Sequence, residues 1–472
     1  MSRKQVSLRA VHPVEHNRDA LRRALDWLLE ERIFEDLALH GNTSWRPVEF
    51  VALTLLWVWS SKHALTEAFT EAHTWSKRLL GRSALDSYQG LVGALVTWTP
   101  KLLPLLLERI HRLMEESCAE HWRVGRWCPL AVDGSRGDMP RTRGNEARFC
   151  AKNYGHGVTA KYRKKKSKGM RRKRNRQSPG RPARPQMWIT LLWHMGLRLP
   201  WSWKLGPSDS NERRHFIELL DAENFPENTL FCGDAGFVGY DFWRAIVDSG
   251  NQFLIRVGGN VKLLKKLGHV RQRDGLVYSW PNQAMQKKQP PLVLRLVRLS
   301  DGRKPIYLLT SVLVERELSH PLTARLYRQR WGIEVQFRSL KQTFGRGSLR
   351  SRNPDRALME MEWSLLGLSV IQLWAVHEQL QAGLLPEHLS VAAAIRAVRQ
   401  CFEELRERPR EGQDLRSRLL HATIDSYQRT SSKAARFKPK SYTIPVAGRP
   451  VVSIAKRRHN THLRKHFPKL AA

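Results

Sequence analysis

Cysteines and long apolar segments are both scarce in this chain of 472 residues. The five cysteines are scattered and include no Cys-x-x-Cys pair, which argues against a zinc ribbon or a disulfide framework and fits a reducing cytosol. The best apolar run, residues 48–59, is shorter than the ~20 residues that a membrane span needs. Residues 1–21 lack the apolar core of a secretory signal. We therefore expect a cytoplasmic protein that does not cross a membrane.

Acidic residues are also few relative to basic ones. The chain has 81 Lys and Arg against 43 Asp and Glu, which gives a formal net charge of +38 and a pI near 10.8. This surplus predicts a polyanionic partner, with nucleic acid as the leading candidate and an acidic membrane surface as the alternative. Residues 161–184 contain 13 Lys or Arg and no acid, and residues 430–472 contain 11 and no acid. We expect a solvated, disordered loop or a DNA-tracking arm in the first segment and a partly disordered tail in the second.

The pattern of apolar residues divides the chain into parts. Helical spacing dominates the first 124 residues, whereas short apolar runs closed by turn residues alternate with helical patterns after Cys128. This order predicts an all-α N-terminal domain followed by an α/β domain built on a mixed sheet. The predicted division is a helical domain at 1–124, an α/β domain at 125–258 and 303–385, a β-rich insertion at 259–302, and a C-terminal helical region with a basic tail at 386–472.

Two aspartates each close a predicted buried strand. Asp133 ends "LAVD" and Asp234 ends "LFCGD", with Gly134 and Gly233 beside them. Ligands gather near strand ends in such sheets, and glycine permits a tight turn or a close backbone approach. If the two strands are neighbours, both carboxylates face the same site. Taken alone, each pattern is also that of an ordinary Asp-Gly turn.

A third carboxylate lies in the basic segment "YRQRWGIEVQFRSLKQTF", within a helix that we predict over residues 319–344. At 100° per residue, Tyr327, Arg330, Glu334 and Lys341 lie within about 60° of arc, next to the apolar face. Side chains in this place are held by packing and still reach a cleft. The alternative interpretation is an Arg330–Glu334 ion pair at i,i+4, worth a few tenths of a kcal/mol.

Three carboxylates surrounded by cations suit one kind of chemistry. Mg²⁺ prefers oxygen ligands and keeps positions open for water and phosphate. Two such ions, about 3.5–4 Å apart, activate a water or a 3′-OH and stabilise the leaving oxygen of an in-line phosphoryl displacement. Neighbouring Arg and Lys side chains suit the phosphates of a DNA backbone.

The spacing Tyr327-x₂-Arg330-x₃-Glu334-x₆-Lys341 resembles the Y-R-E-K signature of a branch of DDE transposases from bacterial insertion sequences. It follows "AVDGS" and "GDAGF" in the family's order, and the resemblance covers residues 125–375. It implies a ribonuclease-H-like catalytic domain with the first Asp on the first strand, the second on the fourth strand and the Glu on a later helix. A β-rich insertion separates the second Asp from the Glu.

Carried over by position, the resemblance implies that Asp133, Asp234 and Glu334 are the catalytic and metal-binding residues. They would hold two Mg²⁺ ions, with Mn²⁺ able to substitute. The residues that the resemblance implies as contacts for DNA phosphates are Tyr327, Arg330 and Lys341.

Two tryptophans are candidates for stacking on an extruded base, Trp331 beside the signature Arg and Trp280 in the insertion. Packing in the core is an equally good interpretation for Trp331. Asp138 is expected in a loop. Glu212 is interpreted as part of a capping box that Asp209 begins.

The function that follows from the resemblance is DNA transposition by cut and paste. The chain would bind the terminal inverted repeats of an insertion sequence, cut DNA with metal-activated water and join the freed 3′-OH to target DNA. Expected partners are double-stranded element ends and target DNA, with a homodimer in the DNA complex, and the expected place is the bacterial cytoplasm at the nucleoid. The helical N-terminal domain is assigned to end binding by analogy alone. Two alternatives stay open, a ribonuclease-H-fold nuclease or resolvase without strand transfer and a non-catalytic DNA-binding protein.

Overall fold

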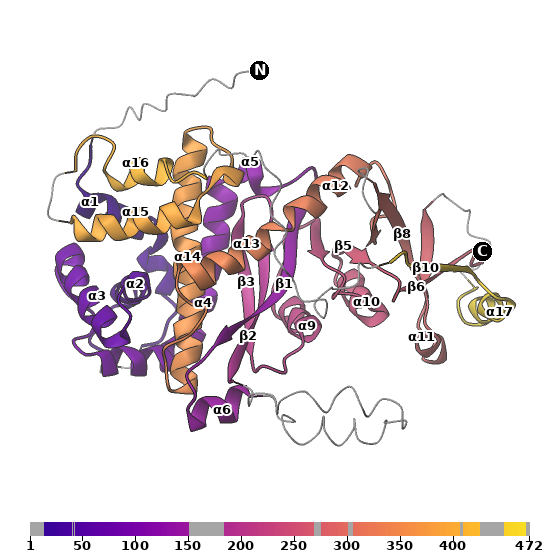
Figure 1. Ribbon diagram of the computed structural model, residues 1–472, viewed down its shortest axis with the longest axis horizontal. Helices are drawn as coiled ribbons and strands as arrows, with labels where there is room; N and C mark the ends of the chain where they lie inside the picture. The colour runs from indigo at the N-terminus through magenta and orange to yellow at the C-terminus, as the bar shows by residue number, and fades with distance from the viewer. Residues whose placement is uncertain are drawn as a thin grey trace, which may run out of the picture.

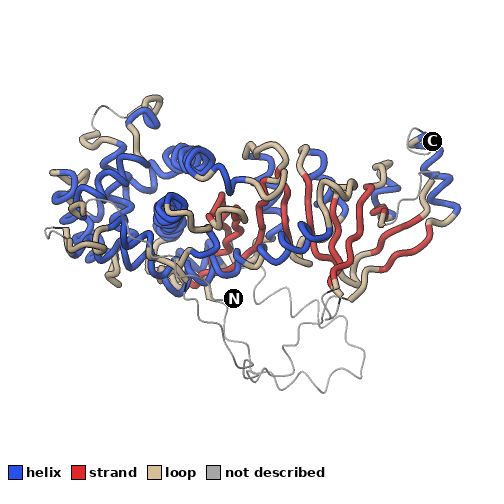
Figure 2. Tube along the Cα trace, turned by 90° about the horizontal axis from the view of Figure 1, so that it is seen from above, coloured by secondary structure: helices blue, strands red, loops and turns tan. Residues whose placement is uncertain are grey.

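The computed structural model of the chain describes residues 14–39, 41, 43–150, 184–268, 275–300, 305–405, 409–424 and 448–468. Helices crowd one end of an elongated molecule, and a sheet extends from them toward the other end (Figure 1; Figure 2). Of the basic segment 161–184 only Arg184 is described, and residues 430–447 of the basic tail are not. The expectations for residues 161–183, 430–447 and 469–472 therefore concern residues outside the described part of the chain, whereas residues 448–468 of the tail are described and include a strand and a helix.

Ten strands of the described chain form one continuous sheet. The order across it is β10-β6-β7-β8-β9-β5-β4-β1-β2-β3. The strand bounds are β1 Cys128–Asp138, β2 Gln186–His194, β3 Leu199–Gly206, β4 Thr229–Gly233, β5 Gln252–Val257, β6 Lys262–Lys265, β7 Leu276–Ser279, β8 Leu292–Leu299, β9 Ile306–Thr310 and β10 Val451–Ile454. β1 pairs antiparallel with β2 and parallel with β4, and β4 pairs parallel with β5. The predicted α/β class with a mixed, ribonuclease-H-like sheet is confirmed.

Helices form most of the remaining described chain. The helix bounds are α1 Asn17–Leu28, α2 Pro47–Trp59, α3 Leu65–Leu80, α4 Tyr88–Ser117, α5 Ala119–Trp122, α6 Arg143–Phe149, α9 Glu212–Ala222, α10 Tyr240–Asp248, α11 Asn282–Gln286, α12 His320–Gln329, α13 Gly332–Arg338, α14 Pro354–Gln381, α15 Val391–Glu403, α16 Leu415–Leu420 and α17 Arg457–His466. Local signals start several of them. Ser87 and Asn353 cap α4 and α14 by accepting backbone N–H groups of the first turn. Pro47 and Pro354 stand in first turns, where a backbone N–H has no intrahelical partner to lose.

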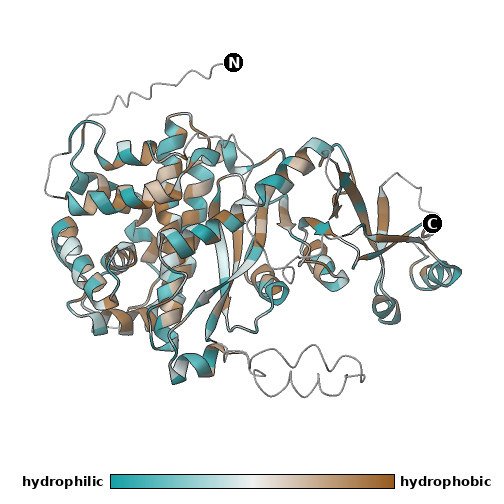
Figure 3. Ribbon diagram, viewed as in Figure 1, coloured by the Kyte–Doolittle hydropathy of each residue, from teal (hydrophilic) through white to brown (hydrophobic). Residues whose placement is uncertain are grey.

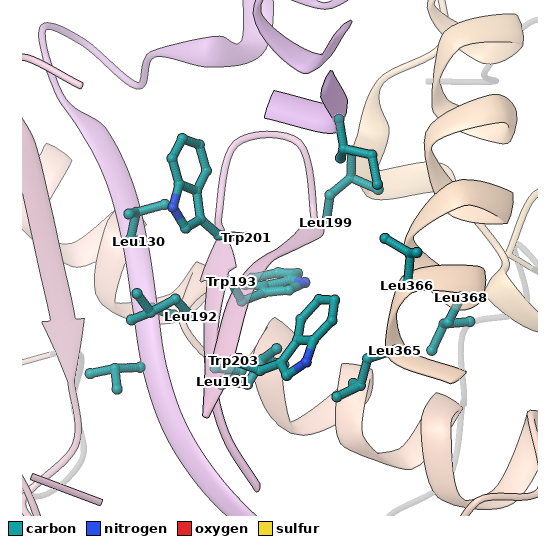
Figure 4. Close-up of a cluster of buried hydrophobic side chains, with 14 of the residues drawn as sticks. Leu130, Leu191, Leu192, Trp193, Leu199, Trp201, Trp203, Leu365, Leu366 and Leu368 are labelled. Carbon is teal, nitrogen blue, oxygen red and sulfur yellow. The ribbon is translucent and has the colours of Figure 1, made fainter. Parts of the chain in front are cut away.

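The long helix α14 joins the helical end of the molecule to the sheet. On one side α14 lies close to α2 at Gly367. A Cβ at this position would lie 2.7 Å from the side chain of Val58, so the close approach requires glycine. Trp59 Nε1 donates a hydrogen bond to Gly367 O at 2.9 Å in the same contact. On the other side Leu366 lies among the apolar side chains of the β2–β3 hairpin, including Trp203 (Figure 4). Apolar residues gather along α14 and the central strands, with polar residues outside (Figure 3).

One described helix is long and apolar enough to cross a membrane, which contradicts the expectation that no segment is. α4 has 30 residues and a mean hydropathy of 1.5 in its most apolar window. Isolated polar residues and two prolines interrupt its apolar run, so the sequence pattern did not reveal it. In the structure α4 packs against α14, where Trp363 Nε1 donates to Thr99 Oγ1 at 2.8 Å. This packing is that of a core helix.

The last described residues complete the sheet of the insertion. β10 pairs in parallel with β6, so that Val451–Ile454 lie beside Lys262–Lys265, and α17 follows β10 on the same lobe (Figure 1). The sequence predicted only a basic tail here, because a four-residue strand whose partner is far away in the chain has no local signature.

Candidate active site

The parallel pairing of β1 and β4 brings Asp133 and Asp234 to the same edge. The last paired residues of the two strands are Ala131 and Cys232. Each aspartate lies two positions beyond its strand's last paired residue, and neighbouring strands are about 4.8 Å apart. β1 itself continues to Asp138, paired with β2, so Asp133 does not end its strand as predicted and Asp138 is not in a loop. The carboxylates lie where β1 continues and β4 stops.

Backbone amides donate to both carboxylates, and burial raises the pKa of Asp133. Gly134 N donates to Asp133 Oδ1 at 2.8 Å, and Gly236 N donates to Asp234 Oδ1 at 2.7 Å. Burial raises the pKa of Asp133 from its ordinary 3.8 to about 7. The charges of Asp234 and Glu212 act in the same direction, whereas the Gly134 N–H and the Arg330 guanidinium oppose the rise. Without a cation, the site therefore disfavours a full set of negative charges.

A further carboxylate, Glu212, approaches from α9 and was missed by the sequence analysis. Its side chain covers Gly134 so closely that a Cβ at that glycine would lie 2.5 Å from Glu212 Oε1. Burial, followed by the charge of Asp234, raises the pKa of Glu212. The predicted capping box is wrong, because the cap of α9 is Asn211, whose side chain accepts from Arg213 N at 2.9 Å. The available signal was an acid in the first turn of the helix that follows the β2–β3 hairpin.

The predicted helix 319–344 is broken into separate segments. α12 ends at Gln329, α13 begins at Gly332, and a π-helical turn, Ser339–Thr343, follows α13. α13 lies against the sheet, and a side chain at Gly332 would overlap the ring of Trp193 on β2. Glycine is thus required for the close approach. The stripe calculated for one straight helix does not hold across the break.

Arg330 links the third carboxylate to the first. It is 5% exposed, its Nη2 lies 3.3 Å from Glu334 Oε1, and its positive charge acts on Asp133. The ion pair that was the alternative interpretation of Glu334 is therefore present. Tyr327 lies under the Arg330 guanidinium, with 5.6 Å between the guanidinium carbon and the ring centre. Within the described ranges, no three His, Cys, Asp or Glu side chains are placed to hold a metal ion as they stand.

Lys341 reaches β1 from the π-helical turn. Its Nζ donates to Ser135 Oγ at 2.6 Å, two residues after Asp133. Burial lowers the pKa of Lys341, and the charge of Asp138 opposes this shift. The structure thus brings the lysine of the signature to the strand that carries the first aspartate.

The two candidate tryptophans differ in exposure. Trp331 is 58% exposed at the break between α12 and α13, so its ring is free. Trp280 is 4% exposed, and its Nε1 donates to Gln289 O at 2.8 Å. In the sheet, β8, β9, β5 and β4 separate β7, which precedes Trp280, from β1. A buried ring so far from the carboxylates does not support the stacking role expected for Trp280.

The sequence of the chain is similar to those of transposases. Residues 130–369 match the family described as "Transposase DDE domain", about half of the chain. The chain is 26% identical over 280 residues to Transposase InsG for insertion sequence element IS4 of Escherichia coli (strain K12), which covers 56% of this chain and 57% of that protein. The matched region thus spans a little over half the length of this curated relative. A piggyBac transposase in a synaptic complex with hairpin DNA aligns with a TM-score of 0.38 and 12% identity, over 88% of this chain and 84% of that chain. On the family match, the chain belongs to the DDE transposases.

Proposed function

We propose that the chain is a DNA transposase that binds the terminal inverted repeats of an insertion sequence and catalyses metal-dependent cleavage and strand transfer. The observation that carries the proposal is that Asp133 and Asp234 each lie two positions beyond the last paired residues of the neighbouring strands β1 and β4, while Arg330 pairs with Glu334 and acts on Asp133 through its charge. Family membership supports the same reaction. The proposed membership in the Y-R-E-K branch is supported by the spacing of Tyr327, Arg330, Glu334 and Lys341 alone.

Although no three acidic side chains of the described residues are placed to hold a metal ion as they stand, the chemistry of the donors fits a divalent cation. Asp133, whose pKa is raised to about 7, is acted on by the negative charges of Asp234 and Glu212, and a cation would balance this repulsion. DDE transposases use divalent metal ions, and for this chain we propose two Mg²⁺ ions, replaceable by Mn²⁺. Asp133, Asp234 and Glu334 would hold them, with Glu212 beside the first two. When bound, such ions supply an activated water or 3′-OH and stabilise the leaving oxygen.

The other residues of the site would hold the DNA. Arg330 pairs with Glu334, and its guanidinium would be available for a DNA phosphate if Glu334 held a metal ion. Lys341, held by its hydrogen bond to Ser135 two residues after Asp133, would supply a second positive charge for the scissile phosphate. Tyr327 orients Arg330 through its ring. Trp331 offers a free aromatic face on which an extruded base can stack.

The proposed partners are double-stranded DNA at the element ends and at the target, with two copies of the chain in the DNA complex. The net charge of +38 supports a polyanionic partner. The proposed place of action is the bacterial cytoplasm, at the nucleoid.

A cleavage and joining assay tests the proposal. Labelled duplex carrying the inverted repeat that flanks the coding region is incubated with the chain in Mg²⁺, in Mn²⁺ or in EDTA. We expect metal-dependent nicks at the repeat end and products joined to target DNA. Glu334→Gln should lower cleavage at least ~10³-fold and leave binding intact, because it removes a group that acts in the transition state. Glu403→Gln, at an exposed position at the end of α15, is the matched control and should cleave normally.

The alternatives give different results in the same assay. Cutting without joined products would indicate a nuclease or resolvase. Binding without any cleavage, in either metal, would indicate a non-catalytic DNA-binding protein. Full cleavage by Glu334→Gln would show that the assignment of the third carboxylate is wrong.

A further inference from the structure

In the described part of the chain, the end of the molecule farthest from the helical domain carries positive charge without acidic compensation. We define the basic lobe as residues 259–268, 275–300 and 448–468, which comprise β6, β7, α11, β8, β10 and α17. These residues include 13 Lys or Arg and no Asp or Glu. With Arg464 set aside, none of its cations is in an ion pair with another described residue. Repulsion among so many like charges destabilises the folded state unless a polyanion balances it.

The lobe is one packed unit made from two distant parts of the chain. Beyond the β10–β6 pairing, Gly268 N donates to Asn460 Oδ1 at 2.9 Å. Trp280 contacts His462 and Phe467 of the C-terminal segment, with ring centres 5.5 and 6.2 Å apart. The apolar side of α17, which includes the buried Leu463, thus packs within the lobe and is not exposed to solvent.

This packing turns the cations of the lobe outward. The exposed Lys and Arg side chains are Lys262, Lys265, Lys266, Lys287, Lys288, Arg298, Arg449, Lys456, Arg457, Arg458, Arg464 and Lys465. The two parts of the chain meet in one cluster, since the charges of Lys288 and Lys465 both help to lower the pKa of His466, after burial and His462. Lys287 and Lys288, which follow α11, therefore lie close to the cations of α17, and Arg458 Nη2 of α17 lies 3.5 Å from Asn282 Oδ1 of α11.

Two turns of the lobe hold lysine where the backbone favours glycine or asparagine. Lys266 has φ 59° and Lys288 has φ 52°, both in the left-handed region. A side chain in this region is less favourable than in ordinary backbone conformations. Lys266 and Lys288 are both exposed on the same surface, so the two strained turns present positive charge to solvent.

We propose that the basic lobe is a binding surface for the sugar-phosphate backbone of a DNA duplex, separate from the carboxylate site and completed by the C-terminal segment. The inference rests on the proposed action on DNA. A duplex fits better than an acidic membrane, because membrane-bound amphipathic helices insert a free apolar face, whereas the apolar residue of α17, Leu463, is buried and the rest of this helix is polar or basic. The contacts are to phosphates, so they contribute affinity without sequence preference.

The salt dependence of duplex binding by the full chain tests this surface. A lobe variant replaces four exposed cations by glutamine, at Lys287, Lys288, Arg457 and Lys465. A control variant removes four exposed cations at the opposite end, at Lys77, Arg78, Arg396 and Arg410. Binding of a labelled duplex of arbitrary sequence is measured in EDTA over a series of salt concentrations. The slope of log K against log salt should become shallower by about 0.9 for each phosphate that the lobe variant no longer neutralises, and change little in the control.

The results separate this inference from the proposed function. If wild-type chain fails to bind duplex, both are overturned. If wild type binds and the slope falls equally in the two variants, attraction is spread over the whole chain and the lobe is not a dedicated surface. Capture of wild-type chain by vesicles of anionic lipid, abolished in the lobe variant, together with unchanged duplex binding, would assign the surface to membranes instead.

A second measurement needs no variant. Acetylation of Lys287, Lys288 and Lys456 in the wild-type chain, read by mass spectrometry, should slow when duplex is present, while acetylation of Lys77 continues. Equal protection of all four lysines, or of none, would contradict the proposal.

Discussion

Replacing Asp133 by asparagine is expected to stabilise the chain in neutral and alkaline solution when no metal is present. Burial raises the pKa of the folded carboxyl from 3.8 to about 7. The folded state therefore keeps a proton that the unfolded chain has released, and stability of the wild type falls as pH rises from about 4 to about 7. The shift corresponds to at most about 4 kcal/mol at 1.36 kcal/mol per pKa unit, and partial access of water reduces this to about 1–3 kcal/mol.

The assay is thermal unfolding of wild type and Asp133→Asn in EDTA, from about pH 5 to about pH 8.5. Asparagine is neutral, close in shape and still able to accept from Gly134 N, so the variant's advantage should grow with pH. Adding Mg²⁺ at high pH should then stabilise wild type and not the variant, because a ligand that binds the folded state raises its stability. An advantage that stays constant with pH, or a variant less stable than wild type at high pH, would refute the reasoning.

Three further outcomes follow from the packing of the site. Gly332→Ala should destabilise the chain by about 1–3 kcal/mol, measured by denaturant or heat, because its methyl group overlaps the ring of Trp193; an unchanged midpoint would show that α13 can move away from the sheet. Trp280→Ala should destabilise by about 3–5 kcal/mol through loss of a buried ring, whereas Trp331→Ala should leave stability unchanged and weaken processing of end DNA; the reverse pattern would exchange their roles. Glu212→Gln should lower metal-dependent cleavage and the affinity for Mg²⁺ measured by calorimetry. No effect on either quantity would show that this carboxylate takes no part in metal binding or cleavage.

The sequence contained the candidate site residues and the order of the elements that carry them. Apolar runs before Asp133 and Asp234 predicted β1 and β4, although β1 continues beyond Asp133, and the spacing from Tyr327 to Lys341 indicated the candidate third carboxylate and its cations. These features are local, because strand pattern, turn residues and motif spacing depend on neighbours in the chain. The alternation of strands and helices was likewise enough to predict the mixed sheet.

The tertiary structure decided what depends on distant segments meeting. Glu212 becomes part of the site only because α9 lies over Gly134, and the helix around Glu334 breaks because Gly332 must pass Trp193. Trp331 is free and Trp280 buried because one stands at that break and the other lies under α17. The C-terminal segment completes a lobe whose other half lies in the insertion. Contacts of this kind are set by packing across the whole chain, so no local pattern in the sequence contains them.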